Sequence, residues 1–276
     1  MTGQPAKAQG AIGFGLQGAT ICLTGGASGL GRACALALAH EGARVGIIDR
    51  RPEKIAPFLA ELDGLGCLAA GAAADVRDPA MIAGAIGHIE DRLGPVGGLV
   101  ASAGTARIAP AAEMTAAAFD LVMDVNVKGA FLCCQEAARR MIARGQGGAI
   151  VLMGSIDGES GHAGRAGYVA SKHAVTGLTR TLALEWGRFG IRVNCVAPSL
   201  VDTPLVRAHT AADYINDVVL DRTPLARLAT PEDVAPVVLM FLSRISAFVT
   251  GTCLPVDGGL MTGFLTRAGG ADPGTG

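Results

Sequence analysis

The chain has 276 residues, half of them hydrophobic and 17% charged, and its formal net charge is -1 at pH 7. So many apolar side chains can build a sizeable core, which excludes an intrinsically disordered chain. The balanced charge disfavours nucleic acid and anionic membranes as partners, and no apolar stretch approaches the about 20 residues that span a bilayer.

Short apolar runs alternate with longer helical patterns along the chain. The periodicity predicts helices at 29–41, 78–93, 115–144, 166–189 and 231–243, the last beginning with Thr230 as N-cap. The near-continuous apolarity of the short runs fits strands of a parallel sheet covered on both faces. This alternation predicts a doubly wound α/β sheet. The predicted strands are 19–24, 44–49, 66–76, 97–104, 148–155, 191–198 and 252–259.

The two ends of the chain differ from the rest in composition. Residues 1–17 and 266–276 are rich in Gly, Ala and small polar residues, so we expect flexible tails there. No change of composition divides residues 18–265, which predicts a single domain.

A glycine-rich segment, TGGASGLG at 24–31, lies between the first predicted strand and the first predicted helix. Gly25, Gly29 and Gly31 permit a tight turn, a close pyrophosphate approach and close helix packing, with phosphate at the helix N-terminus. Asp49 ends the next strand, where an acid can accept both hydroxyls of an adenosine ribose. The alternative for Asp49 is an ordinary helix N-cap or a solvated turn.

Asp49 also predicts which dinucleotide binds. Its carboxylate repels a 2′-phosphate, so we expect NAD as the cofactor. Arg50 and Arg51 follow immediately and could reach a phosphate, which leaves NADP as the less favoured alternative.

Tyr168 stands four residues before Lys172 in GYVASK, which places both side chains on one helix face. A phenol is a poor base near neutrality, but a neighbouring ammonium stabilises the phenolate and makes Tyr168 a usable proton donor and acceptor. Ser155, twelve residues before Tyr168, ends a predicted strand at its carboxyl end, where ligands bind in open α/β sheets.

These motifs together resemble the classical short-chain dehydrogenase/reductase family. The matching patterns are T-G-x-x-x-G-x-G at 24–31, S-x12-Y-x3-K at 155–172 and Asn126 in DVNVKGAF, and the resemblance covers about residues 14–262. It implies a Rossmann-type domain of about seven parallel strands with helices on both faces, which transfers a hydride between nicotinamide and an alcohol or carbonyl carbon.

The resemblance also implies a role for each catalytic position. Tyr168 would be the general acid/base, and Lys172 would assist it while holding the nicotinamide ribose. Ser155 would orient the substrate oxygen, and Asn126 would support a water-mediated proton path from Lys172. Further positions match contacts to the cofactor, along the adenine, the pyrophosphate and the nicotinamide: Ser28, Leu30, Asp75, Val76, Ser102, Ala103, Gly104, Pro198, Val201 and Thr203.

Two segments depart from the family pattern. The usual N-N-A-G reads ASAG at 101–104, which removes two asparagine side chains but can keep the backbone contacts. The usual P-G reads Pro198-Ser199, and serine can close that turn if no positive φ is needed.

The loop between Ser155 and Tyr168 is unusually polar for this chain. We expect Asp157 and His162 to line the substrate pocket, while Glu159, Ser160 and Arg165 face solvent. The long segment 200–225 suits a lid over the pocket. A polar floor under a partly apolar lid favours a polyol, sugar or hydroxylated ring over a fatty acyl chain or steroid.

Two other functions compete with an NAD-linked dehydrogenase of small secondary alcohols or ketones. A 3-oxoacyl-[acyl-carrier-protein] reductase would be similar in fold, but Phe189 stands where such reductases carry a basic docking residue. A dinucleotide-binding regulatory protein without catalysis would be expected to lose part of the catalytic set.

The remaining expectations concern assembly and location. Helix 115–144 is apolar around more than one face, which suits a homo-oligomer, a tetramer or a dimer, although a single subunit remains an alternative. Seven cysteines without a C-x-x-C pair and no signal peptide predict a cytoplasmic protein, and the five histidines show no metal-ligand spacing.

Overall fold

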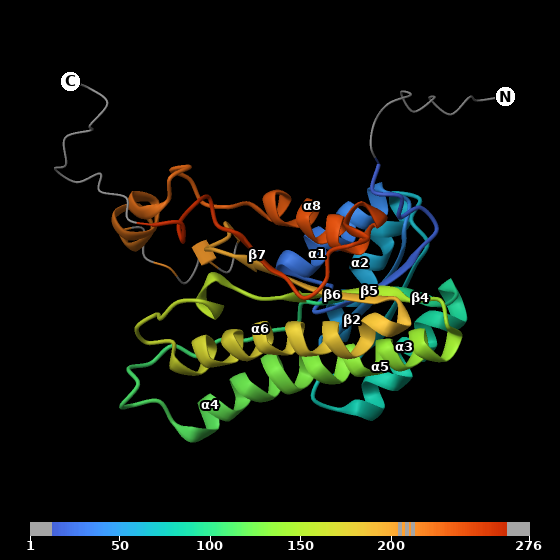
Figure 1. Cartoon of the computed structure of the whole chain (residues 1–276), viewed down its shortest axis with the longest axis horizontal. Helices are drawn as coiled ribbons and strands as arrows, with labels where there is room; N and C mark the ends of the chain where they lie inside the picture. Colours follow the sequence, from blue (N-terminus) through green and yellow to red (C-terminus); the bar gives the residue numbers. More distant parts are fainter. Residues whose placement is uncertain (1–12, 204–205, 208–209, 211–212, 264–276) are drawn as a thin grey trace.

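The computed structural model describes residues 13–203, 206–207, 210 and 213–263, and these form one parallel sheet between two layers of helices (Figure 1). The seven strands lie in the order β3-β2-β1-β4-β5-β6-β7. The first three strands are therefore added towards one edge of the sheet, and β4 to β7 are added on the other side of β1. The strands are β1 Thr20–Thr24, β2 Arg44–Asp49, β3 Ala69–Ala73, β4 Val96–Ala101, β5 Gly148–Met153, β6 Ile191–Pro198 and β7 Cys253–Val256.

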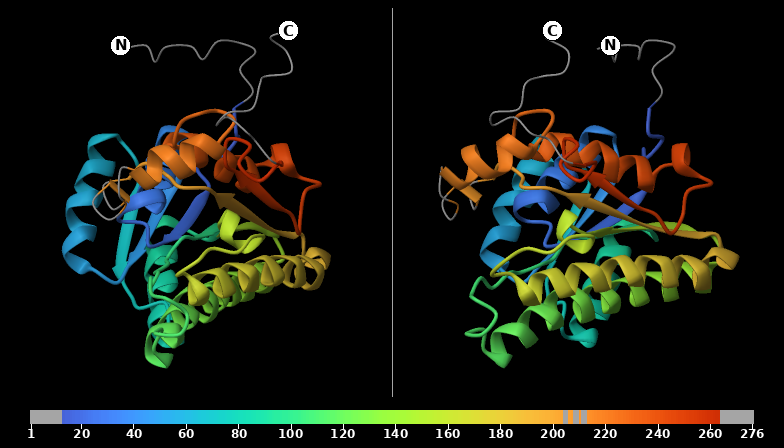
Figure 2. Two further views of the ribbon diagram at one scale, coloured as in Figure 1. Left: turned by 90° about the vertical axis from the view of Figure 1, so that its left-hand side faces the viewer. Right: turned by 60° about the vertical axis from the view of Figure 1, so that its left-hand side comes forward.

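Helices cover both faces of the sheet, as Figures 1 and 2 show. One apolar core lies under α1 (Gly29–His40), α2 (Pro52–Gly64) and α8 (Pro231–Leu242). The other lies under α3 (Pro79–Leu93), α5 (Ala130–Arg144) and α6 (Ala166–Trp186). The doubly wound α/β fold predicted from the sequence is therefore confirmed.

The predicted strands and helices differ from the observed elements mainly at their ends. The runs at 66–76, 97–104 and 148–155 extend past the observed strands, because the apolar pattern continues into loops that leave the sheet. Helix α2 was not among the predicted helices. It begins with Pro52 in its first turn and contains Pro57, which weakens the helical signal of its sequence.

The predicted helix 115–144 is interrupted by a wider turn. It consists of α4 (Ala116–Met123), a π-helical segment η1 (Asp124–Gly129) and α5. Thr115 caps α4 through its side chain, which accepts a hydrogen bond from the Ala118 backbone N–H at 3.2 Å. Short π-helical segments inside α-helices are frequent at functional sites, and Asn126 lies in this segment.

Part of the predicted N-terminal tail packs on the domain. Leu16 is 4% exposed and belongs to the core, and Phe14 packs against that core. The ordered domain thus includes residues that the composition placed in the tail, because two large apolar side chains outweigh the surrounding glycines. Residues 1–12 and 264–276, which make up most of the two predicted tails, lie outside the described residues.

No described helix is long and apolar enough to cross a membrane. Within the same residues, no group of three or more His, Cys, Asp and Glu side chains is arranged to hold a metal ion.

Candidate active site

The glycine-rich segment forms a tight loop between β1 and α1. Gly25 has a φ of +64°, and a Cβ added there would lie 2.9 Å from the Ala103 Cα atom, so this position requires glycine. Gly29 is the first residue of α1, and Gly31 is buried in the first turn of this helix. The loop keeps the backbone open at the start of α1, where N–H groups and the helix dipole favour a phosphate.

Ser28 is the N-cap of α1 but does not use its side chain as a cap. Its hydroxyl instead accepts a hydrogen bond from Arg51 at 2.7 Å. Leu30, in the first turn, packs its partly buried side chain against the core. The missing cap leaves the N–H groups of the first turn for another acceptor, as a bound phosphate would provide.

Asp49 ends β2 with its side chain only 3% exposed. Its carboxylate accepts hydrogen bonds from the Arg51 backbone N–H and from the Arg51 Nε atom, both at 3.1 Å. Arg51 therefore joins Asp49 to Ser28 at the place where the sequence predicts an adenosine ribose. The sequence named Arg51 only as a possible phosphate ligand, and this bridge is a second role.

The next two segments of the predicted cofactor site come from the loops after β3 and β4. Asp75 is paired with Arg77, and the Arg77 hydrogen bonds lower the pKa of the Asp75 carboxyl. Val76 is 7% exposed and lies against Gly129 of η1. In the ASAG segment, the Ala103 backbone N–H donates to the Thr24 hydroxyl at 3.3 Å, so the main chain is anchored without the asparagines.

Ser102 and Gly104 complete this segment. The Ser102 N–H donates to the Val100 carbonyl at 3.1 Å, which turns the chain away from β4. Gly104 faces the Asn126 side chain, because a Cβ added at Gly104 would lie 3.5 Å from the Asn126 Oδ1 atom. The loop after β4 is thus in contact with the predicted catalytic asparagine.

Tyr168 and Lys172 lie one turn apart on α6, and the structure brings them together. The Lys172 Nζ atom is 5.3 Å from the centroid of the Tyr168 ring, within the range of a cation–π interaction. Lys172 is 6% exposed and donates a hydrogen bond to the carbonyl of Met153, the last residue of β5, at 2.8 Å. The ammonium is therefore fixed between α6 and the carboxyl end of β5.

Ser155 lies just after that strand end and is 9% exposed. Its hydroxyl oxygen accepts a hydrogen bond from the Asp157 backbone N–H at 3.1 Å and caps the short 3-10 helix η2 (Ile156–Gly158). A Cβ added at Gly158 would lie 2.9 Å from the Lys172 carbonyl oxygen, so η2 packs directly on α6. This contact holds Ser155 next to the turn of α6 that carries Lys172.

Asn126 is 2% exposed, and its side chain joins three segments. Its Oδ1 atom accepts from the Thr105 N–H at 2.8 Å, and its Nδ2 atom donates to the Thr105 carbonyl at 2.9 Å. Nδ2 also donates to the Ser171 hydroxyl at 3.0 Å, and that hydroxyl donates to the Tyr168 carbonyl at 2.7 Å. The sequence did not identify Ser171, which connects Asn126 to the Tyr168 carbonyl, or Thr105, through which Asn126 holds the loop after β4.

The polar loop before Tyr168 contains a connected set of side chains. Asp157 is buried, and its carboxylate lies 3.2 Å from His162 Nδ1 and 3.6 Å from Arg165 Nη1. His162 Nε2 in turn lies 3.0 Å from the hydroxyl of Tyr214, a residue that the sequence did not single out. Tyr214 begins the π-helical segment η4 (Tyr214–Leu220), inside the predicted lid.

The side chains of this loop differ in exposure. The Asp157 side chain is only 5% exposed and faces His162 and Arg165, so a direct contact of Asp157 with a substrate stays a prediction. Arg165 does not face solvent freely, since it is 22% exposed and pairs with Asp157. Ser160 is half-buried and donates to the Ile156 carbonyl, whereas Glu159 is exposed as expected.

The segment after β6 closes this side of the site. Ser199 donates its N–H to the Val256 carbonyl at 3.1 Å, and it lacks the positive φ that would have required glycine after Pro198. Val201 is 6% exposed and forms a bridge with Ala229, and Thr203 accepts from the Val206 N–H at 3.3 Å. Of the predicted lid, 204–205, 208–209 and 211–212 lie outside the described residues.

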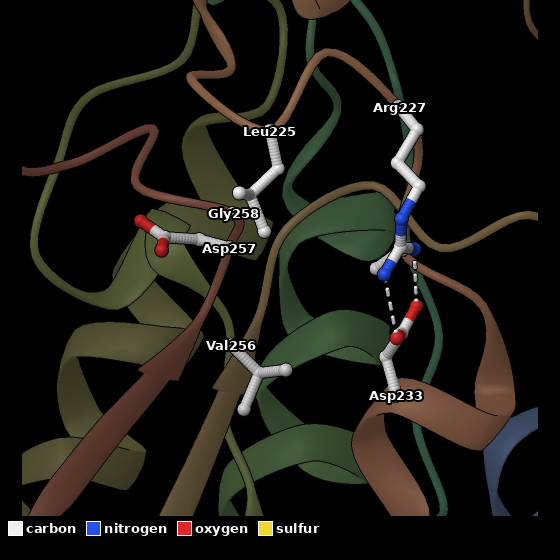
Figure 3. A pocket seen from close by; sticks show the side chains of 7 residues that line it. Leu225, Arg227, Asp233, Val256, Asp257 and Gly258 are labelled. Atoms are coloured by element: carbon white, nitrogen blue, oxygen red, sulfur yellow. Dashed lines mark hydrogen bonds and ion pairs between the residues drawn. The ribbon is translucent and has the colours of Figure 1, made fainter.

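A separate hollow lies where the end of this segment meets β7 and the start of α8 (Figure 3). Arg227 and Asp233 form a two-fold ion pair there, with N–O distances of 2.6 and 2.8 Å. The Asp257 carboxylate accepts from the backbone N–H groups of Gly259 and Met261. Since each of these charged groups already has a partner in the described chain, we interpret the hollow as a structural junction.

The chain is similar to known dehydrogenases and reductases over most of its length. The profile of a family described as Enoyl-(Acyl carrier protein) reductase matches residues 25–261. D-threitol dehydrogenase of Mycolicibacterium smegmatis is 37% identical over 89% of this chain and 94% of its own. 3-oxoacyl-[acyl-carrier-protein] reductase of Thermotoga maritima is 35% identical over 89% of this chain and 99% of its own.

A solved structure is similar over the whole fold. A gluconate 5-dehydrogenase from Burkholderia cenocepacia, in complex with NADP and tartrate, has a TM-score of 0.87 and 35% sequence identity. The match covers 91% of this chain and 98% of that protein.

Proposed function

The chain belongs to the short-chain dehydrogenase/reductase family, and we propose that it transfers a hydride between NAD and a small, polar secondary alcohol or its ketone. The observation that carries the proposal is the placement of Tyr168 beside the buried ammonium of Lys172, with Ser155 packed against the same helix. A non-catalytic binding protein has no need to hold a phenol, an ammonium and a serine hydroxyl together at a strand end.

The residues at the loop after β1 and at the end of β2 fit a dinucleotide. Gly29, at the start of α1, has no described atom within 4 Å of the place of a Cβ, and Ser28 leaves the N-terminus of α1 without a side-chain cap. The buried carboxylate of Asp49 offers acceptors to two ribose hydroxyls. When bound, the nicotinamide ring donates or accepts the hydride of the reaction.

Side chains of the protein itself transfer the proton of the reaction. Tyr168 accepts a proton from the substrate hydroxyl during oxidation and returns one during reduction. The ammonium of Lys172 lies beside the Tyr168 ring, where a cation would compensate the negative charge on the oxygen when the proton leaves. Ser155 already accepts a hydrogen bond from Asp157 N–H, so its own O–H proton is available to the substrate oxygen.

Asn126 acts in this scheme as a positioning residue. Its amide holds the loop at Thr105 against α6, and through Ser171 it fixes the carbonyl of Tyr168. The π-helical turn at Asn126 widens the helix beside the site, which supports the proposed water-mediated proton path from Lys172.

NAD is proposed in preference to NADP because of the charge at the end of β2. The Asp49 carboxylate would repel a 2′-phosphate, and Arg51, the nearest cation, is already paired with that carboxylate. The solved relative that contains NADP leaves the other cofactor as the alternative outcome.

A polyol, a sugar or a sugar acid is the proposed substrate class. Asp157, His162, Arg165 and Tyr214 make the substrate side of the site polar. D-threitol dehydrogenase and gluconate 5-dehydrogenase are among the relatives, and both names describe oxidation of hydroxylated chains. The acyl-carrier-protein reductase remains the second candidate by similarity, but Phe189 replaces a basic docking residue with an exposed aromatic ring.

A spectrophotometric substrate screen tests the proposal. The purified chain is incubated with NAD or NADP and a panel of polyols, sugar acids and 3-hydroxyacyl thioesters, and the reduced cofactor is followed by absorbance. We expect the highest kcat/KM with NAD and a polyol or sugar acid. A preference for the thioester with NADP, or no turnover of any alcohol or ketone, would contradict the proposal.

A further inference from the structure

The contact between His162 and Tyr214 joins two segments that are 52 residues apart. His162 belongs to the loop between Ser155 and Tyr168, and Tyr214 begins η4 in the segment that follows β6. Their rings stack with centroids 6.3 Å apart and an interplanar angle of 29°. The loop between Ser155 and Tyr168 is therefore joined to the segment after β6 by one ring-stacking contact and one hydrogen bond.

The hydrogen-bond directions in this set follow from the chemistry of its members. Ionised Asp157 can only accept, so it receives the proton on His162 Nδ1 across 3.2 Å. In a neutral imidazole the other nitrogen then carries no proton, so His162 Nε2 accepts a hydrogen bond from the Tyr214 hydroxyl. The guanidinium of Arg165 lies 3.6 Å from the second carboxylate oxygen and is an ion-pair partner of Asp157.

The same set consists of one buried carboxylate and two partly exposed rings. The Asp157 side chain is 5% exposed, that of His162 is 28% exposed, and Tyr214 is half-buried. Because the Tyr214 proton is committed to His162, the phenol oxygen presents its remaining lone pairs as an acceptor. A hydroxyl group can supply the matching donor, whereas a plain hydrocarbon chain cannot.

We propose that Tyr214, oriented by His162 and Asp157, is a specificity residue that accepts a hydrogen bond from a second hydroxyl group of the substrate. Ser155 and Tyr168 hold the reacting oxygen at one side of the site, and Tyr214 holds another hydroxyl at the other. Asp157 acts through His162 and is a positioning residue. The inference rests on the proposed function, and it narrows the substrate class to molecules with at least two hydroxyl groups.

The test compares matched substrates that differ only in hydroxyl groups. For the wild type and Tyr214→Phe, kcat and KM are measured with NAD for threitol and for butan-2-ol, which have the same four-carbon chain. We expect Tyr214→Phe to raise the KM for threitol about three- to tenfold, the typical effect of one lost hydrogen bond, with kcat nearly unchanged. The values for butan-2-ol should stay within about twofold, since no bond to Tyr214 is lost there.

Two further variants separate a specific role from a structural one. His162→Ala removes the partner of the Tyr214 hydroxyl and should raise the KM for threitol selectively, as Tyr214→Phe does. Asp217→Asn changes an exposed side chain of the same π-helical segment and should leave both substrates unaffected. Thermal unfolding and NADH binding, measured for each variant, show that the domain is intact.

The possible results discriminate between this inference and the proposed function. An equal loss on both alcohols, or no loss on threitol, overturns the role of Tyr214 while the dehydrogenase activity stands. Turnover of butan-2-ol without turnover of threitol also overturns it. If the wild type oxidises neither these nor any other alcohol of the screen, the proposed function itself fails.

Discussion

Tyr168 is the side chain on which the proposed chemistry depends most directly. It is one of only two tyrosines in the chain, and α6 places it one turn before Lys172, whose buried ammonium lies over its ring. Phenylalanine can keep the contact of the ring with the Lys172 ammonium. The hydroxyl is the only part that can move a proton.

Tyr168→Phe should lower kcat about 10²–10⁴-fold, the usual contribution of a general acid/base group. Binding of NADH, followed by its fluorescence, should persist because the ring and Lys172 remain. Wild-type kcat in this variant would show that another group carries the proton.

Asp49 and Arg51 decide the charge at the end of β2. In the wild type the guanidinium is held by the carboxylate, so we expect a preference for NAD. Asp49→Asn removes the repulsion and frees Arg51 for a 2′-phosphate. The ratio of kcat/KM with NADP to that with NAD should then rise about 10- to 100-fold, which is the usual effect on binding of one hydrogen bond to a charged group.

The control for this change is Asp63→Asn, which removes the same charge from an exposed position of α2. That variant should keep the wild-type ratio. If Asp49→Asn also leaves the ratio unchanged, the end of β2 does not select the cofactor.

At the scale of elements, the spacing of residues in the sequence predicted much of the candidate site but not the hydrogen bonds between distant segments. The order of strands and helices and the Tyr168–Lys172 pair depend on local periodicity, which a sequence displays directly. The pairing of Tyr214 with His162 and the bridge from Asp49 to Ser28 depend on side-chain directions across distant segments. The scarcity of tyrosine was the one signal that could have drawn attention to Tyr214.

Helices α3 and α5 are joined by a charged cluster that supports one face of the sheet. Glu90 on α3 accepts hydrogen bonds from Arg140 at 2.7 Å, from Arg144 at 2.8 Å and from the Val96 N–H at 2.9 Å. Burial alone would raise the pKa of Glu90, but the Val96 N–H and the two guanidinium groups outweigh it and hold that pKa below its usual range.

Glu90→Gln should therefore reduce the free energy of unfolding at pH 7 by about 1–2 kcal/mol. A carboxyl whose pKa is lowered in the folded state stabilises the protein above its unfolded pKa of about 4.3, and this contribution disappears as the pH falls through the lower folded value. The difference in Tm between wild type and variant, measured from pH 7 down to acid, should shrink below about pH 4. A difference that is constant with pH would mean that the carboxylate charge is not the cause.

At the scale of the whole molecule, the sheet ends in a strand with an open edge. β7 pairs only with β6 among the described strands, and exposed apolar side chains lie on it and just before it. They are Ile245, Phe248, Val249 and Leu254, with Phe248 fully exposed. Such an edge, unless covered, favours association with another chain.

We therefore expect the chain to form a homo-oligomer, a dimer or a tetramer, through this region. Phe248→Ser should shift the mass measured by light scattering towards the monomer, while Leu184→Ser, at an exposed position of α6 that is 85% accessible, serves as a comparison. A monomeric wild type at micromolar concentration would contradict the expectation. A shift with Leu184→Ser alone would place the contact on α6.

The distribution of the cysteines leaves one partly exposed thiol at which a label could follow association of the chains. All seven lie in the described part of the chain, and six are buried, with burial raising the pKa of Cys34 and of Cys133 to about 12. Cys253 on β7 is half-buried, and a hydrogen bond from Cys195 lowers its pKa. Thiol reagents should thus label the unmodified protein at one position, on the strand whose edge is proposed to be covered. A fluorophore placed there would make assembly visible as a change in labelling rate or emission, without any engineered cysteine.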